Sequence, residues 1–376
     1  MFMSRNRIGK IDGRFRTKKK GSNRSCNGVP TFDLYFARDE NEICFWISYR
    51  IFWLVSISWC ESRGMALFTC ILTPTQVPLQ AVVCYCHGYL DHPSLTRKRE
   101  LSRLVQKGIC VLMVEYAGHG RSDGTIGLIS NWNDVVDDAS DYFSQTIQRY
   151  FPNLPCFLMG ESMGGAVAYC TYQRLPLLFH RGVVLVCPMA KISPDMLPCQ
   201  WTIDLFRSLA GPKGKGTSLL GFLPIAPSKG GLFDEYSCKV LEKFQMQSAF
   251  PLEYGRKPRV ATARELLDTT LYISNDLMNF DAPFLVQHGK EDRITDPKLS
   301  QAIFDESPSK DKTLKLYEGM WHSLIGGEPD ENVEQVLNDS IEWILERSQK
   351  SPVVAFEALA SREETVRPGI ANSCIK

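Results

Sequence analysis

The stretch Phe157–Ala166 reads FLMGESMGGA and has the pattern of a nucleophile elbow. An apolar run ends at Gly160, Gly-x-Ser-x-Gly follows with Ser162 at its centre, and a helix-forming run starts directly behind it. A chance Gly/Ser turn is the alternative, and the apolar flanks argue against it. Side chains at Gly160 and Gly164 would collide with so tight a turn, which would hold Ser162 in a strained conformation. We therefore predict that Ser162 is a nucleophile at a helix N-terminus, where the helix dipole favours negative charge.

Short apolar runs alternate with amphipathic runs on both sides of this stretch. Strands are predicted over Met65–Leu72, Ala81–Cys86, Ile109–Glu115, Pro155–Met159, Gly182–Cys187, Phe284–His288 and Thr313–Glu318. Helices are predicted over Leu95–Gln106, Trp132–Tyr150, Met163–Gln173 and Val333–Arg347. This alternation indicates the α/β class, with a mostly parallel central sheet that helices cover on both faces.

The alternation stops between Pro188 and Arg259, where prolines recur among apolar residues. So long a segment is rarely a plain loop, and we predict a helical cap insertion over the site at about residues 189–260. Its apolar side chains suit an acyl-binding wall as well as packing on the core. They are Met196, Trp201, Phe206, Leu219, Leu220, Phe222, Leu223 and Ile225. The predicted catalytic domain spans residues 62–348, and residues 349–376 are predicted to be a flexible tail.

Residues 1–61 are predicted to form an extension before this domain. Residues 1–27 carry nine Lys and Arg against one Asp, which is typical of a disordered tract. An organelle-targeting extension and contact with anionic lipid are the alternatives. Residues 43–60, ICFWISYRIFWLVSISWC, are apolar over about the length of a bilayer span, with Arg50 near the middle. Three interpretations of this segment stay open: a membrane anchor, a membrane-surface segment, and a strand or helix packed on the domain.

Composition excludes some classes of function. A net charge of +1 gives no overall attraction for nucleic acid. The thirteen cysteines are scattered, many of them in apolar runs, and no Cys-x-x-Cys pair occurs. This usage favours buried free thiols in a reducing, intracellular compartment over disulfides. Cys84, Cys86 and His87 lie close in sequence but have no second ligand pair, so we predict no metal site.

A serine hydroxyl needs a base to remove its proton, and the base needs an acid to orient it. In folds with this elbow the acid and then the histidine follow the serine, each in a loop after a strand. Asp292 follows the predicted strand that ends at His288, with Glu291 and Asp296 as alternatives. Asp296 is better placed to cap the helix that begins at the next residue. His322 follows the last predicted strand, so we predict Asp292 and His322 as acid and base.

The tetrahedral intermediate of acyl transfer needs two N–H donors aimed at its oxygen. Met163, directly after the nucleophile, is predicted to supply one backbone N–H. The loop after the strand Ala81–Cys86 supplies the other, which we assign to Tyr89, since Gly88 lets the chain pass close to a substrate. We expect His87 and His119 to hydrogen-bond loops near the site and not to move protons.

Five segments together resemble the monoacylglycerol lipase-like α/β hydrolases of the serine aminopeptidase type, especially the plant and algal branch that includes caffeoylshikimate esterases. They are CHGY at 86–89, EYAGHGRSDG at 115–124, GESMGGAVA at 160–168, HGKEDRITDP at 288–297 and KLYEGMWHSLIGGEPDE at 315–331. The resemblance covers about residues 62–348 and implies the same nucleophile, acid, base and oxyanion amides. Two departures stand out: Glu115 replaces the usual Asp, and three residues separate His87 from Asp91 where relatives with acyltransferase claims have four.

These observations predict a serine carboxylic-ester hydrolase that needs no cofactor and no metal. The expected substrate is a monoacylglycerol or a lysophospholipid, which also implies peripheral membrane contact. A small aromatic ester of the caffeoylshikimate kind is the neighbouring alternative. A non-catalytic binding protein with the same fold is the alternative of another class, and such proteins usually lack a member of the triad.

Overall fold

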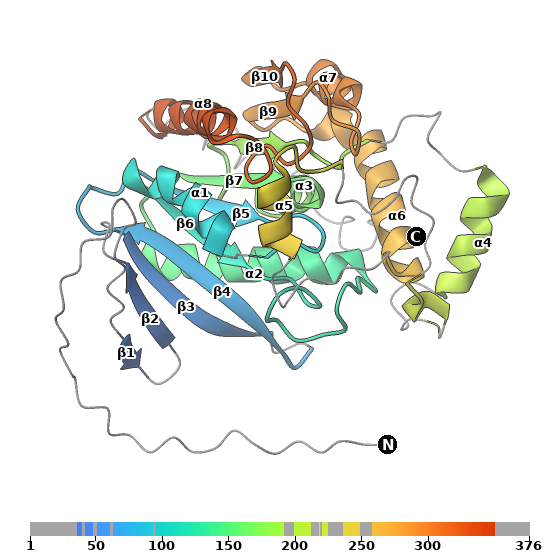
Figure 1. Cartoon of the computed structure of the whole chain (residues 1–376), viewed down its shortest axis with the longest axis horizontal. Coiled ribbons are helices and arrows are strands. Elements are labelled where there is room, and N and C mark those ends of the chain that lie inside the picture. Colours follow the sequence, from blue (N-terminus) through green and yellow to red (C-terminus); the bar gives the residue numbers. More distant parts are fainter. Residues whose placement is uncertain are drawn as a thin grey trace. The chain divides into compact units, whose positions relative to one another are not determined.

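The fold is built on a ten-stranded sheet with the strand order β1-β2-β3-β4-β6-β5-β7-β8-β9-β10 (Figure 1). The computed structural model describes residues 36–39, 42–47, 51–60, 63–92, 95–191, 199–211, 218, 220–224, 236–248 and 258–349. The strands are β1 Phe36–Asp39, β2 Glu42–Ile47, β3 Ile51–Cys60, β4 Met65–Pro74, β5 Ala81–Cys86, β6 Ile109–Val114, β7 Cys156–Glu161, β8 Val183–Val186, β9 Phe284–Gly289 and β10 Lys312–Tyr317. In the sheet, each pair of neighbouring strands from β6 through β5, β7, β8 and β9 to β10 is parallel. The strands β1 to β4 pair antiparallel with one another, and β4 also pairs antiparallel with β6.

Helices lie between most of the parallel strands. They are α1 Leu95–Gln106, α2 Trp132–Tyr150, α3 Met163–Arg174, α4 Gln200–Ala210, α5 Leu241–Ser248, α6 Val260–Asp276, α7 Pro297–Glu306 and α8 Asp330–Ser348, with short 3-10 turns η2 Leu220–Phe222 and η3 Leu277–Asn279. α1, α2 and β5 have the bounds that the sequence predicts, and the other predicted elements differ by a few residues. The structure also contains α6, a helix that was not predicted from the sequence.

Both faces of the sheet are buried, and the side chains of successive residues in a strand point to opposite faces. In β5, Val82 and Cys84 pack with residues of α2 and α3, whereas Val83 and Tyr85 pack with residues of α1 and α8. Every residue of β5, β6, β7, β8 and β9 is buried. The predicted α/β-hydrolase architecture is therefore confirmed. Because β5, β7, β9 and β10 are parallel, the loops after them share one edge of the sheet.

The described part of the apolar segment 43–60 is β-structure. All ten residues of β3 pair antiparallel with β4, from Ile51 opposite Pro74 to Cys60 opposite Met65. The Ser56 hydroxyl lies 2.8 Å from that of Thr69 in the paired position, which helps to hold this register. A domain boundary at residue 61 is therefore wrong, since the sheet continues into the predicted extension. The β-branched and aromatic residues of β3 explain the strand.

The remaining predictions for the chain ends fall outside the described residues. Residues 1–35 and 350–376 are not among them, so the basic tract and most of the predicted tail remain predictions. Among the described residues, no helix combines the length and apolar character that crossing a membrane requires.

The described part of the predicted cap insertion contains helices. α4, η2 and α5 come from this segment, and α4 and η2 pack against each other and against α6. Met196, Leu219 and Ile225, predicted for the acyl-binding wall, lie outside the described residues, as does the side chain of Phe206.

Candidate active site

The turn between β7 and α3 holds Ser162 at φ 57° and ψ −121°, a conformation that L-residues rarely adopt. Backbone bonds fix it there: its N–H donates to the carbonyl of Val186, and its carbonyl accepts from Gly165 and Met189, each at 2.9 Å. A Cβ at Gly160 would lie 2.1 Å from the Gly164 carbonyl oxygen. A Cβ at Gly164 would lie 2.0 Å from a neighbouring backbone oxygen, so both positions require glycine.

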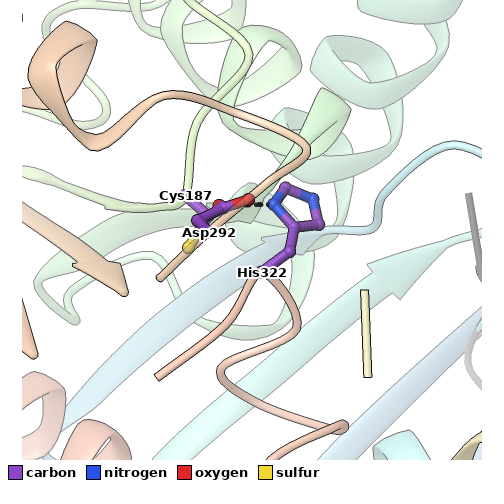
Figure 2. Close-up of side chains that lie close together, drawn as sticks. All are labelled: Cys187, Asp292 and His322. Atoms are coloured by element: carbon purple, nitrogen blue, oxygen red, sulfur yellow. Dashed lines mark hydrogen bonds and ion pairs between the residues drawn. The ribbon is translucent and has the colours of Figure 1, made fainter. Parts of the chain in front are cut away.

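Asp292 and His322 meet at the same edge of the sheet. They come from the loops after β9 and β10, and Nδ1 of His322 lies 2.7 Å from Oδ2 of Asp292 (Figure 2). Both side chains are buried. Since the ionised carboxylate can only accept, Nδ1 carries the proton and Nε2 of the neutral ring is free of it.

The Asp292 carboxylate is held by further donors in its own loop. Oδ1 accepts from the backbone N–H groups of Ile294 and Thr295 at 2.7 and 3.0 Å. Oδ2 accepts from the Thr295 hydroxyl at 2.8 Å and lies 3.0 Å from Nε2 of His288. These contacts fix the orientation of the acid, which in turn orients the ring of His322.

The two alternative acids occupy other positions. Glu291 is exposed. Asp296 caps α7, with its carboxylate accepting from the N–H of Lys298 at 2.9 Å, as predicted. Of the three carboxylates in this described loop, Asp292 is the one that accepts a hydrogen bond from His322.

The acid and base perturb each other's proton affinity. Burial alone would lower the pKa of His322, but the Asp292 charge, the hydrogen bond to it and the Glu161 charge raise that pKa above 6.5. Burial would raise the pKa of Asp292, yet the charge of His322 and hydrogen bonds from His288 and His322 hold it well below 3.8. The pair therefore favours a charged carboxylate beside an imidazole that accepts a proton readily.

The loop after β5 lies directly beside the elbow. A Cβ at Gly88 would lie 3.7 Å from Cβ of Ser162, so this backbone passes the nucleophile at van der Waals distance. The next residue, Tyr89, donates its hydroxyl to the Gly127 carbonyl at 2.8 Å, which anchors the loop. The structure thus brings the two segments that carry the Tyr89 and Met163 amides to the same place.

Comparison with known proteins places the chain in a family. Residues 77–330 match the family described as serine aminopeptidase, S33. The chain belongs to this family. A caffeoylshikimate esterase of Arabidopsis thaliana is 32% identical over 296 residues, which are 78% of this chain and 86% of that protein. A monoglyceride lipase of Rattus norvegicus is 27% identical over 288 residues, or 76% of this chain and 89% of that protein.

A solved structure agrees on the fold. A soluble variant of the monoglyceride lipase of Saccharomyces cerevisiae, in complex with a substrate analog, has a TM-score of 0.64. It is 19% identical and covers 78% of this chain and 96% of its own. The predicted family and enzyme class are confirmed: the protein is an α/β hydrolase of the esterase and lipase type.

Two other histidines of this hydrolase stay neutral. Burial lowers the pKa of His87 to about 3 and that of His119 to about 4. His87 stacks on Tyr116 at 4.0 Å, accepts from the Tyr116 N–H at Nε2 and donates from Nδ1 to the Gly88 carbonyl. It therefore braces the loop before Tyr89, which agrees with the structural role predicted for both rings.

Cys187, which was not predicted as a site residue, lies beside the acid and the base (Figure 2). One ligand atom from each of Cys187, Asp292 and His322 lies within 4.8 Å of the others. A zinc ion would need bonds of about 2.0–2.3 Å, and the 2.7 Å contact between Asp292 and His322 leaves no room between them. Burial raises the pKa of the Cys187 thiol well above 9.0, so it is a neutral S–H group beside Asp292. The sequence signal that points to Cys187 is its position directly after β8, at the carboxyl end of a parallel strand.

Glu115, one of the two departures from the family resemblance, has a structural role in the hydrolase. Its carboxylate is fully buried and lies 2.8 Å from the guanidinium of Arg121. It also accepts from the backbone N–H of Arg121, closing the loop after β6. This pair holds the GHGRSDG segment at residues 118–124.

Proposed function

We propose that the hydrolase cleaves carboxylic esters of lipids with Ser162 as nucleophile, His322 as base and Asp292 as acid. The observation that carries this proposal is the 2.7 Å contact between His322 and Asp292 at the edge of the sheet where the strained elbow presents Ser162. Order along the chain and placement on loops after parallel strands agree with this assignment.

The proposed reaction has two halves. The Ser162 hydroxyl oxygen attacks the ester carbonyl carbon while Nε2 of His322 takes its proton. The N–H groups of Tyr89 and Met163 stabilise the tetrahedral oxyanion, and each such donor is worth about 10²–10³ in rate. Nε2 then protonates the leaving alcohol. Water, deprotonated by Nε2 of His322, then attacks the acyl carbon. The bond from this carbon to Oγ of Ser162 breaks, His322 returns the proton to Oγ, and the carboxylic acid product leaves, while Asp292 stays ionised throughout.

The proposed substrate is a monoacylglycerol or a lysophospholipid. Apolar side chains of the cap segment support this choice because they face solvent: Trp201 is 69%, Leu205 48% and Leu220 46% exposed. Such groups gain free energy when an apolar chain or a lipid surface covers them. The similarity to a monoglyceride lipase points the same way. Peripheral contact with a membrane would follow from this substrate.

A small aromatic ester is the second candidate. The observation in its favour is the 32% identity to a caffeoylshikimate esterase over most of both chains. The two candidates differ in the group that must be bound, a flexible acyl chain or a planar ring. Rates on both classes therefore separate them.

Two measurements test the proposal. A fluorophosphonate probe is expected to label Ser162, and Ser162→Ala is expected to abolish both labelling and turnover. A folded wild-type protein that stays unlabelled would favour the binding-protein alternative. In the second measurement, kcat/KM is compared for monoacylglycerols, lysophospholipids, p-nitrophenyl esters and caffeoyl esters. A caffeoyl ester that exceeds every lipid ester would replace the lipid assignment with the aromatic one.

A further inference from the structure

A buried arginine connects the segments that carry the proposed oxyanion amides. Arg97 lies on α1, with its side chain 8% exposed, and its guanidinium sits between two carboxylates. Nη2 lies 2.9 Å from Oδ2 of Asp91, and Nη1 lies 2.8 Å from Oε2 of Glu161. Burial opposes the charge of Arg97, but both carboxylates raise the pKa of its guanidinium well above the usual range, so the ion pairs persist. The planar guanidinium of arginine can donate N–H groups to two carboxylates at once, so it suits such a bridge better than the ammonium group of a lysine.

The two carboxylates lie next to the two amides in sequence. Asp91 is two residues after Tyr89, and Glu161 is two residues before Met163. The Asp91 N–H donates to the Gly88 carbonyl at 3.2 Å, so Asp91 closes the turn that contains Tyr89. A shift of either carboxylate therefore moves the neighbouring amide.

Glu161 extends the connection to the loop of the base. Its Oε1 accepts from the backbone N–H of Ile325 at 3.2 Å, three residues after His322. A Cβ at Gly326 would lie 3.3 Å from Nη1 of Arg97, so this loop also packs on the guanidinium. One ion-pair cluster, in which Arg97 and Glu161 are buried and Asp91 is half-buried, thus touches the oxyanion loop, the elbow and the loop of His322.

We propose that Arg97 is a positioning residue that sets the spacing of the Tyr89 and Met163 amides by holding Asp91 and Glu161. The inference rests on the proposed function. Those amides act on an oxyanion that forms in the tetrahedral intermediate and its transition states but not in the bound ester, so misplacing them lowers kcat and leaves KM nearly unchanged. Arg97→Met is expected to lower kcat about a hundredfold, and Arg97→Lys to lower it less.

The decisive readout is the affinity for a trifluoromethyl ketone bearing an acyl chain, whose adduct with the serine places an oxyanion at the two amides. Its inhibition constant is expected to rise in parallel with the loss of kcat/KM across the Arg97 variants. Arg99→Met is the matched control, because Arg99 is on the same helix with its side chain 64% exposed. Unchanged kcat and ketone affinity in folded Arg97→Met would overturn the proposal.

A second variant covers the case in which Arg97→Met does not fold. Asp91→Asn removes one arm of the bridge and leaves the pair with Glu161, and it is expected to lower kcat and ketone affinity together. A folded Asp91→Asn with wild-type values of both would also overturn the proposal. Failure of the proposed function is distinguishable, since the wild-type protein would then resist fluorophosphonate labelling of Ser162.

Discussion

Nδ1 of His322 lies 2.7 Å from Oδ2 of Asp292, although the two residues are thirty positions apart in the chain. The contact exists because β9 and β10 are parallel neighbours, so the loops after them end at one edge. It sets both the tautomer of the imidazole and its affinity for a proton.

The first prediction concerns pH. His322 must be neutral to act as base, and its pKa is raised above 6.5, so kcat/KM is expected to fall with decreasing pH around a midpoint above 6.5. Asp292→Asn removes the charge that raises this pKa, so the midpoint is expected to move to lower pH. The same variant should lower kcat by about 10⁴-fold because the tautomer is lost. Profiles of kcat/KM from pH 5 to 9 test this, and a midpoint that does not move would contradict it.

A second prediction separates strain from catalysis at Ser162. Both Ser162→Ala and Ser162→Gly are expected to abolish turnover because the hydroxyl is lost. Glycine adopts φ 57° and ψ −121° without a Cβ clash, so Ser162→Gly should unfold with a free energy about 1 kcal/mol higher than Ser162→Ala. Denaturant unfolding of the two variants measures the difference. Glycine being the less stable would mean that the elbow conformation carries no strain.

The third prediction concerns Thr295, whose hydroxyl donates to Oδ2 of Asp292 at 2.8 Å and lies 3.2 Å from Nδ1 of His322. Thr295→Val removes a donor from a buried carboxylate and should lower the free energy of unfolding by about 1–3 kcal/mol, with a loss of kcat. Thr295→Ser keeps the hydroxyl and serves as control, with smaller changes in both quantities. Equal behaviour of the two variants would show that the hydroxyl has no such role.

The fourth prediction tests the place of β3. A chain shortened to begin at Ser62 lacks the ten-residue antiparallel partner of β4, which becomes an exposed edge. It is expected to melt at a lower temperature and to aggregate more readily than a chain that begins at Ser48 and keeps β3. Thermal unfolding and light scattering of the two chains compare them. Identical melting would place β3 outside the cooperative domain.

Much of the fold was predictable because it is local. The Gly-x-Ser-x-Gly turn, the run lengths of α1, α2 and β5, and the cap at Asp296 depend on residues within a few positions of each other. The apolar segment 43–60 was ambiguous for a physical reason. Its length and composition suit both a lipid environment and a sheet, and pairing with β4 is a non-local contact.

The sequence alone predicts Ser162, Asp292 and His322 as nucleophile, acid and base, since a loop after each predicted strand offers few residues with the required chemistry. The sequence does not show which side chains hold them. Cys187 meets Asp292, and Arg97 meets both Asp91 and Glu161, only because β5, β7, β8 and β9 are neighbours in the sheet. Backbone turns and amphipathic periods are encoded by adjacent residues, whereas buried contacts between distant side chains are decided by the order in which the strands pack.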